Sequence, residues 1–569
     1  GRNYNDDSMS FCLDDGSELL FGPASIDEPA TAILSETGAI ESRVSESELP
    51  TRAQVDLADQ TAILPTGADE NGKRRRSIDK RILAVAILLA IVALGGFLGY
   101  RYYAPGGSKQ IGSIAVMPFV NESGQPDTEY LSDGMTESLM NSLSQLPGLS
   151  VKARSSVFRY KGKDFDPVTV GKELGVQALL TGRLIQRSDD LTLYLELVDV
   201  QTGNRIWGDQ YDRKIPQLIA LQNDIARDVS QKLKAKLSGA DEQRLTKNYT
   251  ANVEAYQLYL KGRFHVFKLT PPDTQKGIEY FEQAIALDPA YSPAYVGLAA
   301  AYRTYALSAD MPSTAVFPKA KAAAEKAVEL DDTLAEAHAV LGFTIFWYDW
   351  DWSAAEKEYK RALDLNPNSA DAHWGYAHLL SNTGRHPEAL TEVKRATELE
   401  PLNSIINTSE GLYLTDAGKI DEALASLKKA AEINPDFWLM HTFTASAYME
   451  KGMYPEAIAE ARKARALPGV SSMPSAYLGY ALAKSGGRSE AESILRELLE
   501  RQSGQYLPPY HMALLYNGLG NTAEALRSLE RGFDQRDPKM TFLKVDPKWN
   551  NLRSEPRFQA LLAKMAFPG

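Results

Sequence analysis

Few residue types in this chain could do metal or nucleophilic chemistry: 569 residues include one cysteine and seven histidines. Cys12 is followed three residues later by Asp15, a spacing that suits part of a metal knuckle. A structural zinc site needs four ligands, and this segment supplies at most two. A reactive thiol and a residue without a function remain open as alternatives. The single thiol excludes a disulfide within the chain.

The histidines do not form a recognisable ligand set. His373 and His378 are five residues apart, which is a poor spacing for two ligands on one helix face, and no H-E-x-x-H motif is present. We therefore predict packing or surface roles for them. Because no nucleophile, base and orienting residue fall into a catalytic pattern, we also predict that the chain is not an enzyme and binds no cofactor. The histidines are His265, His338, His373, His378, His386, His441 and His511.

Composition indicates several folded domains. Hydrophobic residues make up 44% and charged residues 24% of the chain, which is too long for a single core. A net charge of −12 argues against a nucleic-acid-binding protein, which normally has a basic face. We therefore expect protein partners and no nucleic acid.

One segment predicts a membrane-spanning helix. Residues 82–100 carry no charge, and a helix of this length covers about 28 Å, close to the thickness of a bilayer's hydrocarbon core. Six cations lie between Lys73 and Arg81, and few follow the segment, so the positive-inside rule predicts a cytoplasmic N-terminus and a periplasmic or extracytoplasmic C-terminal part. Residues 24–81, polar and without periodicity, are predicted to be a disordered cytoplasmic linker.

Residues 111–238 predict a small α/β domain with a mixed sheet. SIAVMPF and LSVKARS have the pattern of buried strands, and three further strands follow the helix predicted at 166–176. The expected order is βαβαβββα. The motifs VMPFVNESG, YLSDGMTESLMNSLSQLPGLSVKARSS and LVDVQTGNRIWGDQYDR resemble the TolB amino-terminal-like (FlgO-like) domain, a bacterial envelope module without a known catalytic residue set.

The remaining half predicts a repeat array. Pro367, Pro401 and Pro435 are 34 residues apart (401 − 367 and 435 − 401), and alanines occur five and twelve residues before each of them. This is the tetratricopeptide (TPR) pattern, in which small residues allow paired helices to approach closely. We predict about eight repeats over 252–535 and a capping segment over 536–569. The predicted fold is thus multidomain: one transmembrane helix, the α/β domain and an all-α TPR superhelical solenoid.

The first helix of each repeat should line the concave face of this solenoid. On that basis we predict that aromatic and polar residues along the array contact a protein or peptide partner. For the aromatic stretch FWYDWDW at 346–352, packing around a lengthened turn is the alternative to ligand contact. The predicted contact residues are Phe346, Trp347, Trp374, His378, Asn382, Thr408 and Asp416.

Several sequence segments resemble those of a bacterial protein lineage in which a TPR array follows a TolB-like domain. Among them are YFEQAIALDP, LLSNTGRHPEAL and LRSEPRF. Members of that lineage carry a Ser/Thr kinase, a winged-helix DNA-binding domain or an adenylate cyclase ahead of the membrane span. The resemblance leaves two hypotheses: a membrane-anchored interaction scaffold, or the sensor half of a transmembrane signalling protein.

The N-terminal segment 1–23 resembles the second half of a zinc-ribbon module written CPxCGRxYxDDxxxFCxxDG. The resemblance implies that Cys12 is the remnant of a truncated module. Zinc is therefore expected only in a longer native chain.

Overall fold

The computed structural model describes residues 111–568 except 147, 234–246, 269, 309 and 469. The predicted zinc-ribbon-like segment with Cys12, the linker and the membrane-spanning helix at 82–100 lie outside these residues. Within the described part of the chain, no helix combines the length and the apolar composition needed to cross a bilayer.

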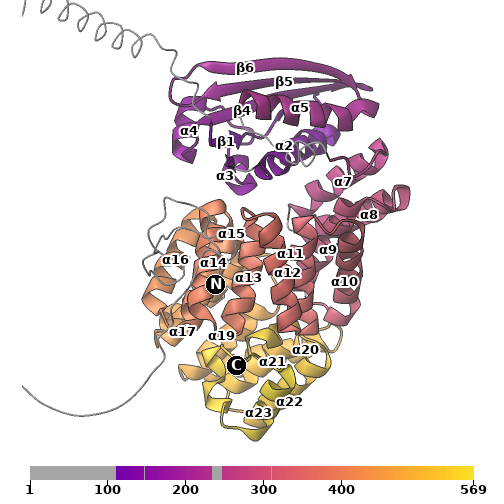
Figure 1. Cartoon of the computed structure of the whole chain (residues 1–569). Helices are drawn as coiled ribbons and strands as arrows, with labels where there is room; N and C mark the ends of the chain where they lie inside the picture. The colour runs from indigo at the N-terminus through magenta and orange to yellow at the C-terminus, as the bar shows by residue number, and fades with distance from the viewer. Residues whose placement is uncertain are drawn as a thin grey trace, which may run out of the picture. The chain divides into compact units, whose positions relative to one another are not determined.

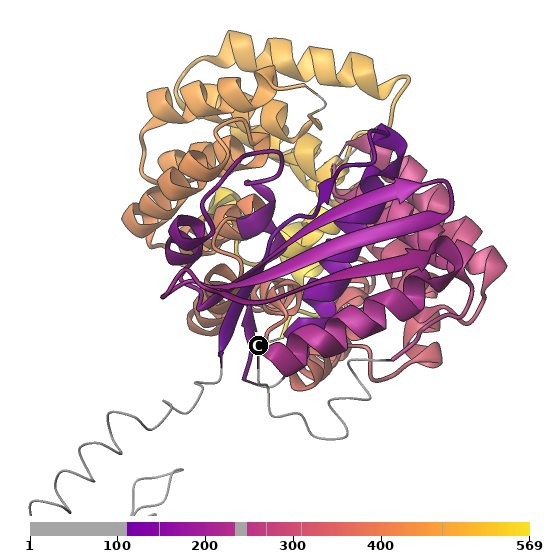
Figure 2. The same ribbon diagram turned by 90° about the horizontal axis from the view of Figure 1, so that it is seen from above.

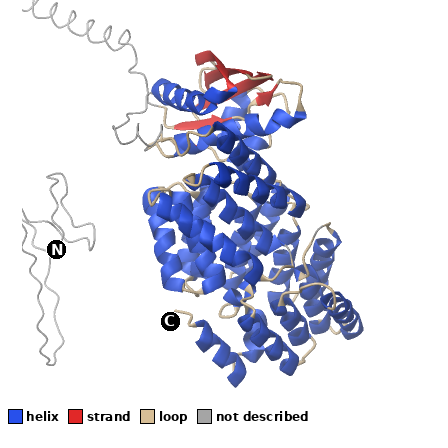
Figure 3. Cartoon of the chain, turned by 90° about the vertical axis from the view of Figure 1, so that its right-hand side faces the viewer, coloured by secondary structure: helices blue, strands red, loops and turns tan. Residues whose placement is uncertain are grey.

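Residues 113–232 form the predicted α/β module around a mixed sheet with the strand order β3-β1-β4-β5-β6 (Figure 1). β1 runs parallel to both β3 and β4, and the three long strands β4, β5 and β6 are antiparallel and lie side by side in Figure 2. Among the described residues the strands, red in Figure 3, are confined to this module. Its elements are β1 (Ser113–Val116), β2 (Val120–Asn121), α2 (Glu129–Ser144), β3 (Ser150–Val151), α3 (Arg154–Phe158), α4 (Pro167–Leu174), β4 (Ala178–Arg187), β5 (Asp190–Asp199), β6 (Arg205–Lys214) and α5 (Leu218–Lys232).

The element order agrees with the sequence pattern except at the short additional strand β2, which was not predicted, and around residue 150. The strand predicted over 149–155 ends at Val151, and the helix α3 begins at Arg154. The buried residues Leu149 and Val157 still face the core on either side of this change, so the hydrophobic pattern was compatible with both states.

Eight antiparallel helix pairs follow within the described residues (Figures 1 and 3). We call the first helix of a pair helix A and the second helix B. The pairs are α7 (Val253–Val266) with α8 (Pro271–Leu287), α9 (Ser292–Ser308) with α10 (Ser313–Leu330), α11 (Ala335–Thr344) with α12 (Trp352–Leu365), α13 (Ala370–Asn382) with α14 (His386–Leu399), α15 (Ser404–Asp416) with α16 (Ile420–Ile433), α17 (Trp438–Glu450) with α18 (Tyr454–Ala466), α19 (Met473–Lys484) with α20 (Arg488–Gln502), and α21 (Pro509–Gly518) with α22 (Thr522–Asp534).

The predicted repeat signals have the expected structural roles. Helix B ends at Leu365, Leu399 and Ile433, two residues before each periodic proline, and the alanines of the pattern are buried between helices. A second 34-residue period was missed: in five of the pairs the turn between helices A and B contains a glycine in the left-handed region, with φ of +75° or more at every site. A left-handed residue after helix A reverses the chain sharply and favours glycine. These residues are Gly384, Gly418, Gly452, Gly486 and Gly520.

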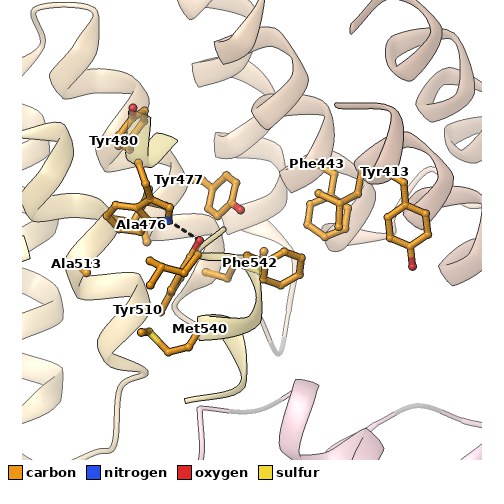
Figure 4. Close-up of a cluster of buried hydrophobic side chains, with 14 of the residues drawn as sticks. Tyr413, Phe443, Ala476, Tyr477, Tyr480, Tyr510, Ala513, Met540 and Phe542 are labelled. Carbon is orange, nitrogen blue, oxygen red and sulfur yellow. Dashed lines mark hydrogen bonds between the residues drawn. The ribbon is translucent and has the colours of Figure 1, made fainter. Parts of the chain in front are cut away.

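The C-terminal segment does not simply extend the array. η4 (Pro538–Phe542), η5 (Pro547–Leu552) and α23 (Pro556–Met565) follow the last pair, and Met540, Leu543 and Trp549 are fully buried. In Figure 4, Met540 and Phe542 lie among aromatic residues of α17, α19 and α21. The predicted capping segment therefore also covers part of the inner face of the repeats.

Candidate partner-binding cavity

A cavity of about 550 Å³ is lined mainly by helix A of the pairs from α7 to α17, and residues of α2 and α5 of the α/β module also line it. Helix A faces inward in a TPR array, so residues far apart in sequence meet there. Three of the predicted contact residues, Trp347, Trp374 and His378, line this cavity. The structure adds Tyr256 and Arg303, which come from repeats further toward the N-terminus.

The aromatic wall of the cavity is held in place by hydrogen bonds and ring contacts. Trp374 Nε1 donates to Ser409 Oγ at 2.9 Å, which leaves the apolar surface of its indole for the cavity. The rings of Trp347 and His378 lie 4.9 Å apart between centroids, and those of Trp374 and His378 lie 6.0 Å apart. The result is a rigid apolar surface of the kind that anchors peptide side chains.

His378 is neutral in this environment. Burial, together with the nearby charge of Lys539, lowers its pKa to about 3. Its Nδ1 is hydrogen-bonded to the Tyr413 hydroxyl, whereas Nε2 is buried without a protein partner. The ring therefore contributes an unused polar atom to the wall of an otherwise aromatic region.

Three cations line the cavity, and they differ in their partners. Arg263 pairs with Glu137 at 3.2 Å, and Arg303 pairs with Asp371 at 3.5 Å. Lys539 has no carboxylate within ion-pair distance among the described residues. Burial lowers the pKa of Lys539 to about 8, and the Asp537 carboxylate partly offsets this effect.

Four of the predicted contact residues lie outside the cavity. Asn382 Nδ2 donates to Thr541 Oγ1 at 3.0 Å, so the C-terminal segment covers this residue. Phe346 is 0% exposed and packs against Trp347.

Thr408 is fully buried, and its Oγ1 has no protein partner. Asp416 faces the buried ion pair of Lys548 and Asp546, and burial, reinforced by Asp546, holds the pKa of Asp416 well above its usual range. The role of Phe346, Asn382, Thr408 and Asp416 in partner binding stays a prediction.

The aromatic stretch at 346–352 was predicted either to pack around a lengthened turn or to contact a ligand, and the structure shows packing for most of it and a cavity position for one residue. Residues Ile345–Asp349 form one turn of π-helix, η3, which lengthens the connection from α11 to α12. Trp352 packs inside the array, where its Nε1 donates to the Met565 carbonyl at 2.9 Å. Trp350, in the left-handed region at φ +59°, packs against Phe533. Of this stretch, only Trp347 lines the cavity.

Three of the histidines connect the two helices of a repeat. His338 Nδ1 lies 2.6 Å from a carboxylate oxygen of Glu358, and His441 Nδ1 lies 2.6 Å from one of Glu460. His373 is bonded to Glu392 in the same way, and in all three the Nε2 atom contacts a carbonyl oxygen six residues earlier. These histidines have structural partners, and within the described part of the chain no three His, Cys, Asp or Glu side chains are placed to hold a metal ion.

A second hollow, of about 880 Å³, lies where the start of α2 meets α7 and α8. Two of its basic groups share one carboxylate: His265 Nδ1 lies 2.8 Å from Asp273, and Lys268 lies 3.3 Å from the same carboxylate. Lys261 Nζ lies 5.0 Å from the ring centroid of Tyr130. This hollow is larger but lacks the buried, unpartnered polar atoms of the first cavity.

The sequence analysis missed several residues that line the cavity, some in the first repeats and some in the C-terminal segment. Tyr256 and Arg303 lie on helix A of the first two pairs, so their repeat positions could have identified them. Lys539 and Phe542 also line the cavity, but they come from η4, where no repeat position exists. Only the folded chain shows that these two residues face the inner surface of the array.

Family models match two parts of the chain. Residues 109–228 match the second domain of HilA/YgeH-like transcriptional regulators, which covers most of the α/β module. Residues 351–407 and 408–471 match tetratricopeptide repeat models, in agreement with the helix pairs described above. The TolB-like resemblance seen in the sequence is not among these matches.

Curated relatives match about half of this chain or less. The putative adenylate cyclase 3 of Rhizobium meliloti (strain 1021) is 30% identical over 236 residues, 41% of this chain and 40% of the relative. The transcriptional regulator HilA of Salmonella typhimurium is 25% identical over 282 residues, 49% of each protein. The chain thus spans less than half the length of the curated relatives it matches. Among solved structures, PilF of Pseudomonas aeruginosa is 24% identical over 38% of this chain and 94% of that chain, with a TM-score of 0.30.

Proposed function

We propose that the chain is a protein-interaction scaffold that binds a protein or peptide partner in the cavity on the inner face of its TPR array. The observation that carries this proposal is the aromatic lining of that cavity, to which Trp347, Trp374 and Phe443 contribute. Its volume of about 550 Å³ suits a short peptide segment or a few large side chains. Rigid aromatic anchors supply much of the binding energy in interfaces of this kind.

In this proposal the scaffold is anchored in the bacterial inner membrane. The support is the uncharged segment 82–100 and the cations before it, which by the positive-inside rule favour a periplasmic location for the α/β module and the array. The TolB-like resemblance of residues 111–238 agrees with an envelope location.

The scaffold is tested by proximity labelling from the full chain in its native host. Trp374→Ala removes an aromatic wall of the cavity, and we expect the partner proteins labelled by the wild type to be lost. Trp207→Ala makes the same chemical change on β6, outside the cavity, and should leave the labelled set unchanged. An identical set from all three proteins would overturn the cavity as the binding site.

A second candidate is the sensor half of a transmembrane signalling protein. It is favoured by the relatives, which are named as a putative adenylate cyclase and a transcriptional regulator and extend well beyond the matched region. The complete genomic reading frame separates the two candidates: a kinase, cyclase or DNA-binding domain ahead of the span supports the sensor, and a start codon just before Gly1 supports the scaffold.

A further inference from the structure

The sheet of the α/β module ends in a long strand that has no neighbour on one side. β6 is the last strand in the order β3-β1-β4-β5-β6, and among the described residues no strand pairs with its outer edge (Figure 1). It runs over ten residues, whereas β3 at the opposite end of the order has two. α5 covers one face of β6, where the Tyr211 hydroxyl donates to Asp228 at 2.6 Å. An unpaired strand edge of this length is a template for pairing with another chain.

The backbone groups that face this edge follow from the pairing of β6 with β5. The Ile215 amide donates to the Asp189 carbonyl at 2.8 Å, which continues the register of the two strands by one pair. Hydrogen-bonded and non-hydrogen-bonded pairs alternate along antiparallel strands, so the odd-numbered residues of 207–213 bond to β5. The even-numbered residues therefore direct their amides and carbonyls to the outer edge. These residues are Gly208, Gln210 and Asp212.

Charged side chains of β6 lie along this edge. Asp209 Oδ1 accepts a hydrogen bond from the Gln210 amide at 2.9 Å, and Arg213 Nη1 donates to the Asp212 carbonyl at 3.0 Å. Asp209 is exposed and has no ion pair among the described residues. Arg213 is 36% exposed and also lies 3.3 Å from Asp224 of α5. The edge thus presents a carboxylate and, four residues later, a guanidinium.

A second copy of β6 has charge complementarity with this edge in one antiparallel register. A two-fold pairing that keeps even residues opposite even residues must be centred on a residue rather than between two residues. Centring it on a charged residue places that charge opposite its own copy, which is unfavourable. Centring it on Gly208 or Gln210 leaves every charge opposite an uncharged residue. Centring it on Tyr211 places Asp209 opposite Arg213 of the second copy, and by symmetry this occurs twice.

We propose that the α/β module pairs with a second copy of this chain through antiparallel β6 edges centred on Tyr211. In this register Gln210 lies opposite Asp212 of the second copy, and their outward amides and carbonyls exchange backbone hydrogen bonds that continue the sheet across the two-fold axis. Charges on an edge strand usually oppose pairing, whereas here Asp209 and Arg213 each meet the opposite sign. No residue of β6 lines the cavity of the array, so this surface is independent of the proposed partner site.

Two charge reversals test the register on the full-length chain, purified in detergent. Each places like charges opposite one another in the self-pair: Asp209→Lys opposes a lysine to Arg213, and Arg213→Glu opposes a glutamate to Asp209. We expect either change to raise the dissociation constant of the dimer at least about tenfold in sedimentation equilibrium. Mixing the two variants restores opposite charges at both sites, so the mixed dimer should form about as tightly as the wild-type dimer.

The matched control is Lys172→Glu, because Lys172 is an exposed lysine of α4 in the same module. This variant should leave dimer formation unchanged. Thermal melts show whether each variant is folded, and recovery on mixing itself requires that both variants fold. A wild-type chain that stays monomeric over the whole concentration series would overturn the proposal. So would a dimer that neither reversal weakens, or one that both weaken without recovery on mixing.

A disulfide places the two-fold axis directly. In a Cys12→Ser background, Asp209→Cys and Arg213→Cys in one chain bring cysteines of the two copies opposite one another, in a non-hydrogen-bonded pair with Cα atoms about 4.5 Å apart. Asp209→Cys alone leaves its two cysteines about 13 Å apart along the strands, too far for a disulfide. We expect covalent dimers from the double variant alone. Cross-linking of the single variant would place the axis at residue 209, and its absence from both variants would equally refute the register.

Discussion

Trp549 offers a direct test of whether the C-terminal segment is part of the folded array. Its side chain is 0% exposed, and its Nε1 donates to the Tyr510 hydroxyl at 2.8 Å. The two rings meet edge to face, 5.3 Å apart between centroids, and Phe558 packs on the other side. Trp549→Ala would remove the largest side chain that joins this segment to α21.

The expected loss follows from these contacts. Replacing a buried tryptophan by alanine costs about 3–5 kcal/mol through lost burial and the cavity left behind. The Tyr510 hydroxyl keeps its bond to Asp546 at 2.9 Å, so the change leaves no buried polar group unsatisfied. We therefore expect a loss of about 4 kcal/mol in the free energy of local unfolding. In repeat proteins such a loss is confined largely to neighbouring repeats.

Hydrogen exchange measured by mass spectrometry on the full chain reports this directly. A loss of about 4 kcal/mol corresponds to a roughly thousandfold decrease in amide protection. We expect it in α21 and α19, whereas β4 of the α/β module should exchange as in the wild type. Leu499→Ala is the control, because Leu499 is 41% exposed on α20. If α21 in Trp549→Ala stays within about threefold of wild-type protection, the segment is not part of the array's core.

Two further predictions concern other parts of the molecule. The hydrogen bond to Glu460, opposed by burial and assisted by a backbone carbonyl, raises the pKa of His441, so the folded state favours the charged ring. The stabilisation that the charged ring provides is complete below the ordinary pKa of 6.5 and is lost as the pH rises through the folded pKa. His441→Gln should therefore lower the free energy of unfolding in urea more at about pH 5.5 than at about pH 8.5. An equal decrease at both pH values would contradict this prediction. At Gly171, a Cβ would lie 2.2 Å from Val200 Cγ2. Gly171→Ala should lower the free energy of unfolding by about 1–3 kcal/mol, as measured by thermal unfolding, and adding Val200→Ala should restore part of it. If the single variant is as stable as the wild type, helix α4 can shift to accommodate the added methyl group.

The repeat array could be predicted from the sequence because its signals are local. The prolines end helix B and the alanines allow close helix contacts, and each of these signals depends only on residues within one repeat. The three long strands of the module were equally readable, because turn residues separate them and each pairs with its neighbour in sequence. Where the pattern was shorter, as around Val151 and Arg154, helix and strand could not be distinguished.

The division of the inner face into covered and open surface was decided only by the tertiary structure. Trp374 and Asn382 are both on helix A of one repeat, yet the first lines the cavity and the second is covered by Thr541, 159 residues further along the chain. Repeat periodicity reports which residues face inward, because it follows from contacts within and between neighbouring helices. It carries no information about a non-repeating segment that packs across several repeats. Lys539 therefore enters the cavity through long-range packing alone.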